Sequence, residues 1–388
     1  MMPAYLFRVA ILIVVLTAAP AAHARAEVAA SDTSAHRSKF IDPEDGWFDI
    51  SAFLDTGHGF VPILIPVTEP AVGYGLAGAL VFINRNPPAS DGSYRRPNMS
   101  MVGGMGTENG TWAAFAGHSG SWRDDRLQTL VGGIYGSINL DFFGIGEGPL
   151  NENPIRYELE PAGGLVQARY RVGRSPMQLG LAYGFATIDA SFEDDVLPEG
   201  ITADERESRI GGLVPAVIFD SRDNVFTPTR GLYGQLESSI FAEAFGGTSN
   251  FERVNATALV YLPLSRTVFL GARGEAAFSF DDVPFYVRPY ISLRGAPVLR
   301  YMGEHAASLE IEARWQFWRR VSAVGFAGAG IAWVATGELE SDQSIVTGGG
   351  GLRYEIARRY GLHMGIDAAW GPDESAIYVQ FGSAWFRP

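Results

Sequence analysis

The sequence contains no cysteine among its 388 residues. This absence excludes disulfide bonds, thiolate metal ligands and the acylated cysteine of a lipoprotein. Positive charge is also in short supply, because 30 Lys and Arg residues face 43 Asp and Glu residues, for a net charge of −13. We therefore do not expect a nucleic-acid partner, since such partners are held largely through their phosphates.

Long apolar runs are missing from most of the chain. Beyond the N-terminus, no stretch reaches the roughly 18 consecutive apolar residues of a membrane-spanning helix, so a helical inner-membrane protein is excluded. The N-terminus itself has Arg8, an apolar run at 9–16 and a small-x-small site at 22–24. This order is typical of a secretory signal peptide, and it predicts that residues 1–24 are cleaved on export.

Histidine, a common general base, occurs only six times. Outside the predicted signal peptide, the histidines lie on separate segments without the paired spacing of a helical metal site: His36, His58, His118, His305 and His363. Ser308 close to His305 is too weak a signal to define a nucleophile and its base. We expect no enzymatic activity, no metal site and no cofactor.

Two-residue alternation, by contrast, is abundant. Residues 25–58 lack a sustained period and are predicted to be a periplasmic N-terminal tether. From 59 to 388, blocks of about eight to twelve residues alternate large apolar side chains with small or polar ones, the period of a β-strand. In the clearest block, polar residues separate Leu309, Ile311, Ala313, Trp315 and Phe317.

A single two-faced strand also suits a water-soluble sandwich. However, the pattern repeats to the end of the chain, and no helical stretch is present to cover so many apolar faces. Lipid is the remaining environment for them. The sequence therefore predicts an all-β fold, a transmembrane antiparallel β-barrel of about 16 strands, uncertain by two.

The connections between the blocks fall into two classes, as they do in outer-membrane barrels. Tight turns, which we place in the periplasm, are predicted near 122–126, 172–176, 262–266, 318–321 and 357–361. Longer connections, which we place outside the cell, are predicted at 139–157, 190–208, 281–306 and 335–344.

Two motifs narrow the interpretation. The first is FDSRDN at 219–224, followed by TPTRG at 227–231, and the second is LRG at 293–295, followed by LRY at 299–301. In this order the motifs resemble the bacterial surface antigen family of outer-membrane barrels, to which BamA and TamA belong. The resemblance covers most of residues 60–386.

The resemblance implies a sixteen-stranded barrel whose Arg-Gly loop folds back into the lumen and whose first and last strands pair weakly. Arg294 and Gly295 are the loop residues. A guanidinium drawn into a narrow lumen must be paired, whereas on an outer loop it would lie in solvent. The inward-facing acidic residues that are candidate partners of Arg294 are Asp367, Glu312, Glu310 and Glu355.

The first motif is predicted to form a periplasmic turn with a structural role. Local ion pairs, a proline that fixes one backbone angle and a permissive glycine would hold it. The residues concerned are Asp220, Arg222, Asp223, Pro228 and Gly231.

The sequence departs from the family in three ways. No room is left for the periplasmic substrate-docking repeats of larger relatives, so we expect a short member of the family. Gly328 replaces the acid expected to meet the loop arginine. The chain also ends WFRP at 385–388, which displaces the terminal aromatic assembly signal by two residues.

From these features we expect a protein of the Gram-negative outer membrane that assists the insertion or translocation of protein or lipid. Its partners would be outer-membrane lipid, a protein or lipid client and an unidentified periplasmic protein. The alternative is a passive pore or structural barrel in which the Arg294 loop constricts a channel.

Overall fold

A computed structural model of the chain describes residues 40–56, 59–84, 97–146, 148–193, 198, 201–202, 205–334 and 342–385. The predicted signal peptide and the first part of the predicted tether lie outside the described residues. So do His36, His58 and the last three residues of the WFRP end. No helix among the described residues is long and apolar enough to cross a bilayer.

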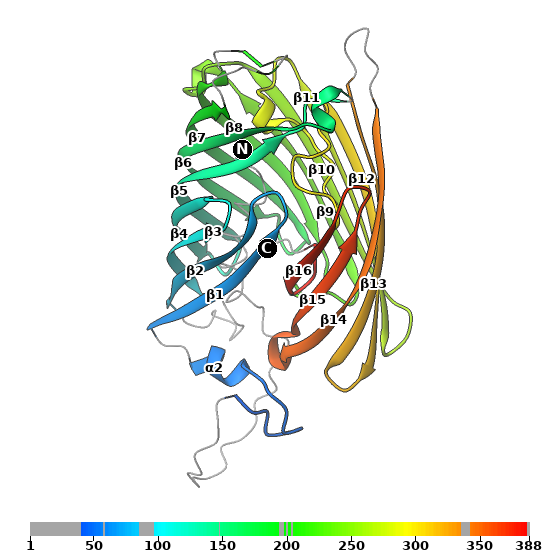
Figure 1. The fold of residues 1–388 in the computed structure, drawn as a ribbon. Helices are drawn as coiled ribbons and strands as arrows, with labels where there is room; N and C mark the ends of the chain where they lie inside the picture. Colours follow the sequence, from blue (N-terminus) through cyan, green and yellow to red (C-terminus); the bar gives the residue numbers. More distant parts are fainter. Residues whose placement is uncertain are drawn as a thin grey trace.

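The described residues form one antiparallel sheet of sixteen strands, each paired with its neighbours in sequence and curled into a nearly closed barrel (Figure 1). The predicted fold class and strand number are confirmed. The strands are β1 (Gly59–Glu69), β2 (Gly73–Asn84), β3 (Asn98–Thr107), β4 (Trp112–Trp122), β5 (Leu127–Phe142), β6 (Ile155–Arg171), β7 (Met177–Phe192), β8 (Glu207–Asp220), β9 (Gly231–Phe241), β10 (Phe251–Pro263), β11 (Val268–Phe280), β12 (His305–Trp318), β13 (Val321–Trp333), β14 (Gln343–Ala357), β15 (Leu362–Trp370) and β16 (Ser375–Phe381).

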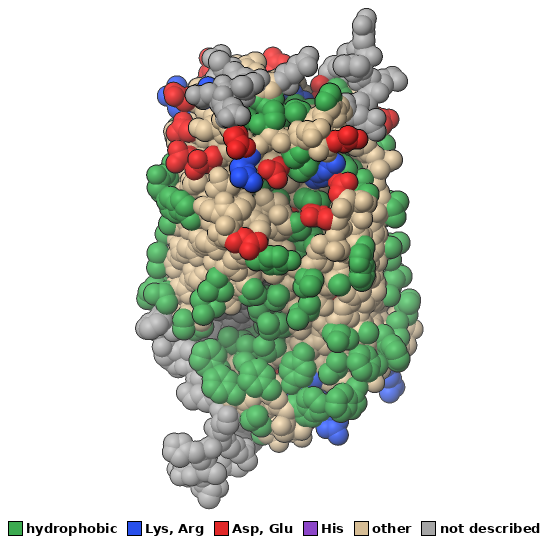
Figure 2. Space-filling model, viewed as in Figure 1, with side chains coloured by type: hydrophobic (Ala, Val, Ile, Leu, Met, Phe, Trp, Pro, Cys, Tyr) green, Lys and Arg blue, Asp and Glu red, His purple; other side chains and the backbone are tan. Residues whose placement is uncertain are grey.

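The alternation in sequence becomes an outer and an inner face of the wall. In β12, Leu309 and Trp315 are about half exposed, whereas Glu310 between them is completely buried on the lumenal side. Figure 2 shows hydrophobic side chains spread over the middle and lower wall, with acidic side chains gathered in the upper part and basic side chains at both ends. This distribution suits a wall whose outer face contacts acyl chains.

The connections lie where the sequence predicted them. The five predicted tight turns join β4 to β5, β6 to β7, β10 to β11, β12 to β13 and β14 to β15, all at one end of the barrel, which we call the turn end. The four predicted long connections follow strand ends at the other end, the loop end, although residues 147, 194–197, 199–200, 203–204 and 335–341 within them lie outside the described residues. The 24 residues between β11 and β12, which we call the lumenal loop (281–304), include a short 3-10 helix, η5 (Phe285–Val287).

The last part of the predicted tether is folded. Residues 40–56, here called the N-terminal segment, contain a bridge between Ile41 and Phe48 and the short helix α2 (Ser51–Thr56). The segment lies at the turn end, below β14 and β1 in Figure 1. It is therefore docked on the barrel just before β1 begins.

Candidate functional site

The lumenal loop turns into the barrel and packs against the inner face of β13. Ile291 and Leu293 are buried there, beside glycines of the strand. A Cβ atom on Gly328 would lie only 2.8 Å from a methyl carbon of Leu293. Glycine at this position, where the resemblance led us to expect an acid, thus lets the loop approach the wall closely.

Arg294 lies at the tip of the lumenal loop and is 8% exposed. Its Nε donates to Oε1 of Glu310 at 3.0 Å, and its Nη1 donates to Glu312 at 2.7 Å and to Asp367 at 2.8 Å. The guanidinium also stacks 3.6 Å from the ring centroid of Phe326. Three carboxylates on two strands therefore surround one arginine. The charge-assisted hydrogen bonds between them fix the loop in place.

Two more arginines complete this lumenal network, which consists of Arg273, Arg294, Glu310, Glu312, Arg353 and Asp367. Arg353 donates to both oxygens of Asp367, at 2.5 and 2.7 Å. Arg273 lies 3.9 Å from Glu310. Because charges of both signs alternate, each buried carboxylate has a cationic neighbour, which offsets the cost of desolvation.

The structure thus brings Arg294 together with three of its four predicted partners. The fourth, Glu355, lies near the turn end of β14, where its backbone N–H donates to the carbonyl of Arg320 at 2.9 Å. The two-residue period identified its strand correctly but carries no information about depth along the barrel. Sequence analysis missed Arg273 and Arg353 as members of the network, although Arg353 is two residues from Glu355 and so shares the inner face of its strand.

Gly295 connects the network to the last strand. Its backbone N–H donates to the hydroxyl of Tyr378 in β16 at 3.1 Å. Its φ of +90° lies in the left-handed region, and a Cβ would lie 3.0 Å from the backbone of Trp370. Both conditions favour glycine here.

The lumenal loop also reaches the first strand. The N–H of Val298 donates to Oε1 of Glu69, at the end of β1, at 3.2 Å. Together with the Gly295 contact, this bond means that one loop holds both end strands of the sheet from inside.

The gap between those end strands, which we call the seam, carries no backbone ladder among the described residues. A bond of 3.4 Å from the N–H of Val379 to the hydroxyl of Thr68 joins them. β1 is 11 residues long and β16 only 7. The β1 edge also carries Pro62 and Pro66, which have no N–H to donate.

Elsewhere in the barrel, prolines interrupt a ladder on one side only. Beside Pro161, pairing of β6 with β5 is interrupted while pairing with β7 continues. Beside Pro215, pairing of β8 with β9 is interrupted in the same way. Since the β1–β2 ladder continues past Pro62 and Pro66, their nitrogens face the seam, which therefore lacks two donors.

After β16 the chain turns into the lumen. The N–H of Gly382 donates to the carbonyl of His363 at 2.7 Å. Trp385 is 5% exposed, and its indole N–H donates to Glu310 at 2.5 Å. The displaced aromatic end thus joins the lumenal network, a position that strand alternation alone does not reveal.

The turn between β8 and β9 contains the first motif. Arg222 forms a bidentate pair with Asp220, at 2.9 and 2.8 Å. Asp223 accepts the N–H groups of Thr229 and Arg230. Gly231 has a φ of +109°, and a Cβ there would lie 2.4 Å from a backbone oxygen.

The same turn is docked to its surroundings. Pro228 is buried within it. The side chain of Asn224 donates to the carbonyl of Tyr360 at 2.8 Å, and the carbonyl of Phe226 accepts the N–H of Ser383 at 2.6 Å. These contacts connect the turn to the β14–β15 turn and to the C-terminal segment, which suits the structural role predicted for the motif.

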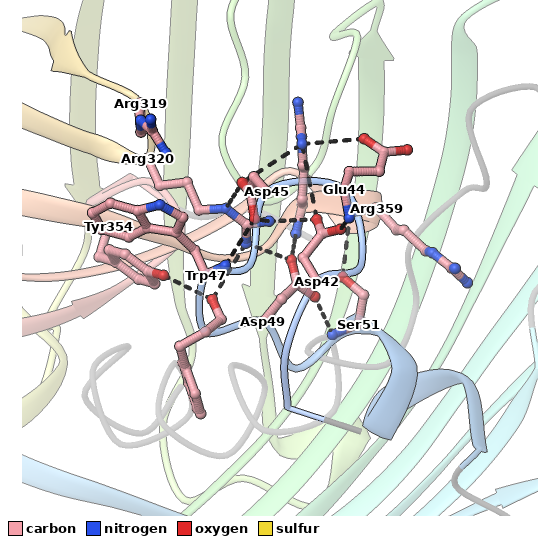
Figure 3. A network of polar contacts seen from close by, with 12 residues as sticks. Asp42, Glu44, Asp45, Trp47, Asp49, Ser51, Arg319, Arg320, Tyr354 and Arg359 are labelled. Carbon is pink, nitrogen blue, oxygen red and sulfur yellow. Dashed lines mark hydrogen bonds and ion pairs between the residues drawn. The ribbon is translucent and has the colours of Figure 1, made fainter. Parts of the chain in front are cut away.

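Arg320, in the turn between β12 and β13, holds the N-terminal segment (Figure 3). Its Nε donates to Asp45 at 2.7 Å, its Nη1 to Asp49 at 2.7 Å, and its Nη2 also binds Asp42. Trp47 packs edge-on against Trp318, with ring centroids 4.9 Å apart. We call this group the Arg320 clamp. Sequence analysis missed it because its two halves lie far apart in the chain.

The Arg320 clamp shifts the acidity of its members. The hydrogen bond from Arg320 lowers the pKa of Asp45 below its usual value. Burial by itself would raise the pKa of Asp49, but hydrogen bonds from Ser51, from the backbone of Arg358 and from Arg320 outweigh it and lower that pKa. Both carboxylates are therefore ionised when the segment is docked.

The remaining histidines do not converge. His118, His305 and His363 lie on β4, β12 and β15. Among the residues that the structure describes, no group of three or more His, Asp or Glu side chains is arranged to hold a metal ion. The arrangement of charges instead suits a structural plug and a weakly joined seam.

Comparisons with known proteins match this geometry. Residues 137–372, more than half of the chain, match the Omp85 superfamily domain. A search of curated sequences finds no significant match. Among solved structures, BamA from Haemophilus ducreyi lacking POTRA domains 1–3 superposes with a TM-score of 0.56 at 12% identity, over 84% of this chain and 69% of that one.

Two CdiB structures are similar to the same extent. CdiB from Escherichia coli has a TM-score of 0.55 at 15% identity, over 82% of this chain and 61% of that one. CdiB from Acinetobacter baumannii has a TM-score of 0.55 at 11% identity, over 83% and 59%. The present chain therefore spans about three fifths of the length of either CdiB chain.

Proposed function

Because the chain belongs to the Omp85 superfamily of outer-membrane barrels, we propose that it assists the insertion or translocation of proteins at the outer membrane, with the seam as the working part. The observation that carries the proposal is the seam itself. Between the described strands β1 and β16, the backbone N–H of Val379 donates to the hydroxyl of Thr68, and no backbone ladder joins the two edges. An unpaired strand edge is a template for another strand.

The lumenal loop holds the two edges of the seam together from inside the barrel. It contacts Glu69 on one side and Tyr378 on the other, and the lumenal network fixes its tip. Opening the seam requires the bond between Val379 and Thr68 and a contact of the lumenal loop to break, but it breaks no strand ladder among the described residues. A client strand would then pair with the free edge of β1 or β16.

Locking the seam tests the proposal. Thr68→Cys with Val379→Cys places two thiols across it, in a chain that has no other cysteine. After oxidation, we expect the chain to lose its ability to accelerate the folding of a urea-unfolded outer-membrane barrel into phospholipid vesicles. A reductant should restore the activity.

A matched control locks a continuous ladder. Ala77→Cys with Met105→Cys joins facing positions of β2 and β3, and its oxidation should leave the folding rate of the client unchanged. Full activity with a cross-linked seam would refute the proposal.

A passive pore is the second candidate function, because the lumen contains a cavity bounded by the lumenal loop. Conductance in planar bilayers separates the two functions. A low conductance that rises in Arg294→Ala indicates a plugged barrel, whereas a large and steady conductance of the unaltered chain favours a pore.

A further inference from the structure

The lumen of this barrel has two chemically different sides. A cavity of about 580 Å³ lies inside it, within the range of roughly 300–1,000 Å³ found for ligand pockets. On the side formed by β1 to β5 the middle of the lining is apolar and includes Ile65, Val67, Met99, Met101, Phe115 and Ile134, while the polar residues of these strands, Glu69, Ser119, Ser121, Gln128 and Thr129, lie near the strand ends. Interiors of outer-membrane barrels are normally polar, so this side of the lumen requires its own explanation.

The apolar lining results from strands that are apolar on both faces. In β1, Leu64 is 67% exposed on the outer face while Ile65 next to it is buried on the inner face. In β3, Val102 faces outwards and Met101 inwards. The apolar outer face is explained by contact with acyl chains of the bilayer. The apolar inner face would suit contact with an apolar chain inside the barrel in the same way.

Small residues keep space open beside these side chains. Gly132 of β5 and Gly163 of β6 line the cavity and have the inner-face parity of their strands. A larger side chain at either position would project into this part of the lumen. Methionine at two lining positions adds a flexible surface that adapts to a variable apolar ligand.

The cavity extends to the seam. Residues from both of its edges line the cavity, among them Val67 of β1 and Val379 and Phe381 of β16. Because no backbone ladder joins the described strands β1 and β16, a hydrocarbon chain can pass from the bilayer into the lumen without breaking a strand ladder.

The opposite side of the cavity is polar. It is lined by Gln235, Glu237, Asn255, Thr257 and Arg273, on β9 to β11. An apolar wall that faces a polar wall suits an amphipathic molecule, with its chain on one side and its ester or head group on the other.

We propose that the lumen binds an acyl chain of a membrane phospholipid, which enters through the seam and lies against the inner face of β1 to β5. The proposal shares the seam with the proposed function, but it requires no protein client. It assigns a ligand to the half of the lumen that the Arg294 network does not occupy.

Photolabelling tests the proposal directly. The full chain is reconstituted in phosphatidylcholine vesicles that contain a small fraction of phosphatidylcholine with a diazirine at the end of one acyl chain, then irradiated and mapped by mass spectrometry. We expect label at lumen-facing Met99, Met101 and Phe115, besides the lipid-facing reference positions Leu181 and Val217. Label confined to lipid-facing positions would overturn the proposal.

A matched pair of variants sharpens the result. Val214→Trp places a large ring in the cavity from β8, whereas Val217→Trp places the same ring on the outer face of the same strand. Lumenal label should fall by roughly tenfold in the first variant and stay unchanged in the second. Equal lumenal label in both would also refute the proposal, and the experiment on the unaltered chain decides even if one variant does not fold.

The same experiment separates this proposal from the proposed function. If the lumen is labelled while the oxidised Thr68→Cys/Val379→Cys chain still accelerates client folding, the lipid site stands and the insertion role fails. If the lumen is not labelled while oxidation abolishes client folding, the reverse holds.

Discussion

The seam and the wall opposite it differ in the length of their strands and in how completely those strands are paired. β5, β6, β7 and β8 are 16, 17, 16 and 14 residues long and pair on both sides. β15 and β16 are only 9 and 7 residues long. Each additional ladder residue adds hydrogen bonds that stabilise a wall. The opposite wall is therefore held together by long, continuous ladders, whereas the seam can open without breaking one.

Proline marks the same difference. Pro161 and Pro215 sit where a ladder inside the opposite wall is interrupted, and pairing resumes on either side. Pro62 and Pro66 instead lie on a strand with one free edge. The two prolines are four residues apart and remove two hydrogen-bond donors from the same edge. The sequence of β1 itself therefore weakens pairing across the seam.

The largest expected effect comes from breaking the lumenal network. Arg294→Ala leaves Glu310 and Asp367 buried with fewer partners, and removal of one member of a buried charge cluster typically costs about 3–5 kcal/mol. The lumenal loop should detach, and both seam edges should lose their contact from inside. Urea unfolding, followed by tryptophan fluorescence, measures the loss in free energy of unfolding.

Hydrogen exchange distinguishes a local effect from a global one in the same variant. Protection should fall in β1, β15 and β16 and remain in β5 to β8. Arg300→Ala, which removes an ion pair with Asp373 outside the network, serves as the control and should change protection less. A uniform loss of protection around the barrel would contradict the difference between the seam and the opposite wall.

A smaller effect is expected from giving the seam the donors it lacks. Pro62→Ala with Pro66→Ala restores two N–H groups on the free edge of β1. Thr68 lies beside Val379 and β16 ends at Phe381, so the N–H at position 66 is the one within reach of β16. The barrel should gain about 0.5–1.5 kcal/mol, the contribution of one net hydrogen bond. Client folding should slow, because opening would now break that hydrogen bond.

Pro161→Ala is the matched control, since it changes a proline in a strand already paired on both sides. It should leave the rate of client folding unaltered. A doubly substituted β1 with unchanged stability and unchanged activity would mean that the two prolines do not keep the seam open.

The sequence predicted those parts of the barrel that depend on local period or on a motif. Alternation placed Leu309 outside and Glu310 inside, because a strand turns successive side chains to opposite faces. The Arg-Gly motif singled out Arg294, and the face of each strand then supplied three carboxylates within reach of it. Depth was not predictable, as Glu355 shows, because period-2 says nothing about height along the barrel axis.

Contacts between remote segments were also beyond the reach of sequence patterns. Arg320 meets Asp45 across 275 positions of the chain, and no local signal pairs them. Trp385 follows the alternation of β16, but the chain turns inward at Gly382 and carries the ring into the lumen. Both contacts depend on closure of the barrel, because closure brings the segments before β1 and after β16 close to strands in the middle of the sequence.

The smallest effect is expected at the turn end, where the Arg320 clamp holds the segment that leads into β1. Docking lowers the pKa values of Asp45 and Asp49 below the ordinary value of 3.8. The contribution of these carboxylates is therefore fully present above that value and is lost as the pH falls through their lowered pKa values. Hydrogen exchange of residues 40–56 should accelerate over that acidic range, with that of β5 to β8 unchanged. Arg320→Ala should release the segment at neutral pH, whereas Arg319→Ala, whose guanidinium lies 5.9 Å from the ring centroid of Trp47, should not. If the segment stays protected in Arg320→Ala, then the aromatic contacts of Trp47 hold it, and the charged part of the clamp contributes little to the position of β1 at the seam.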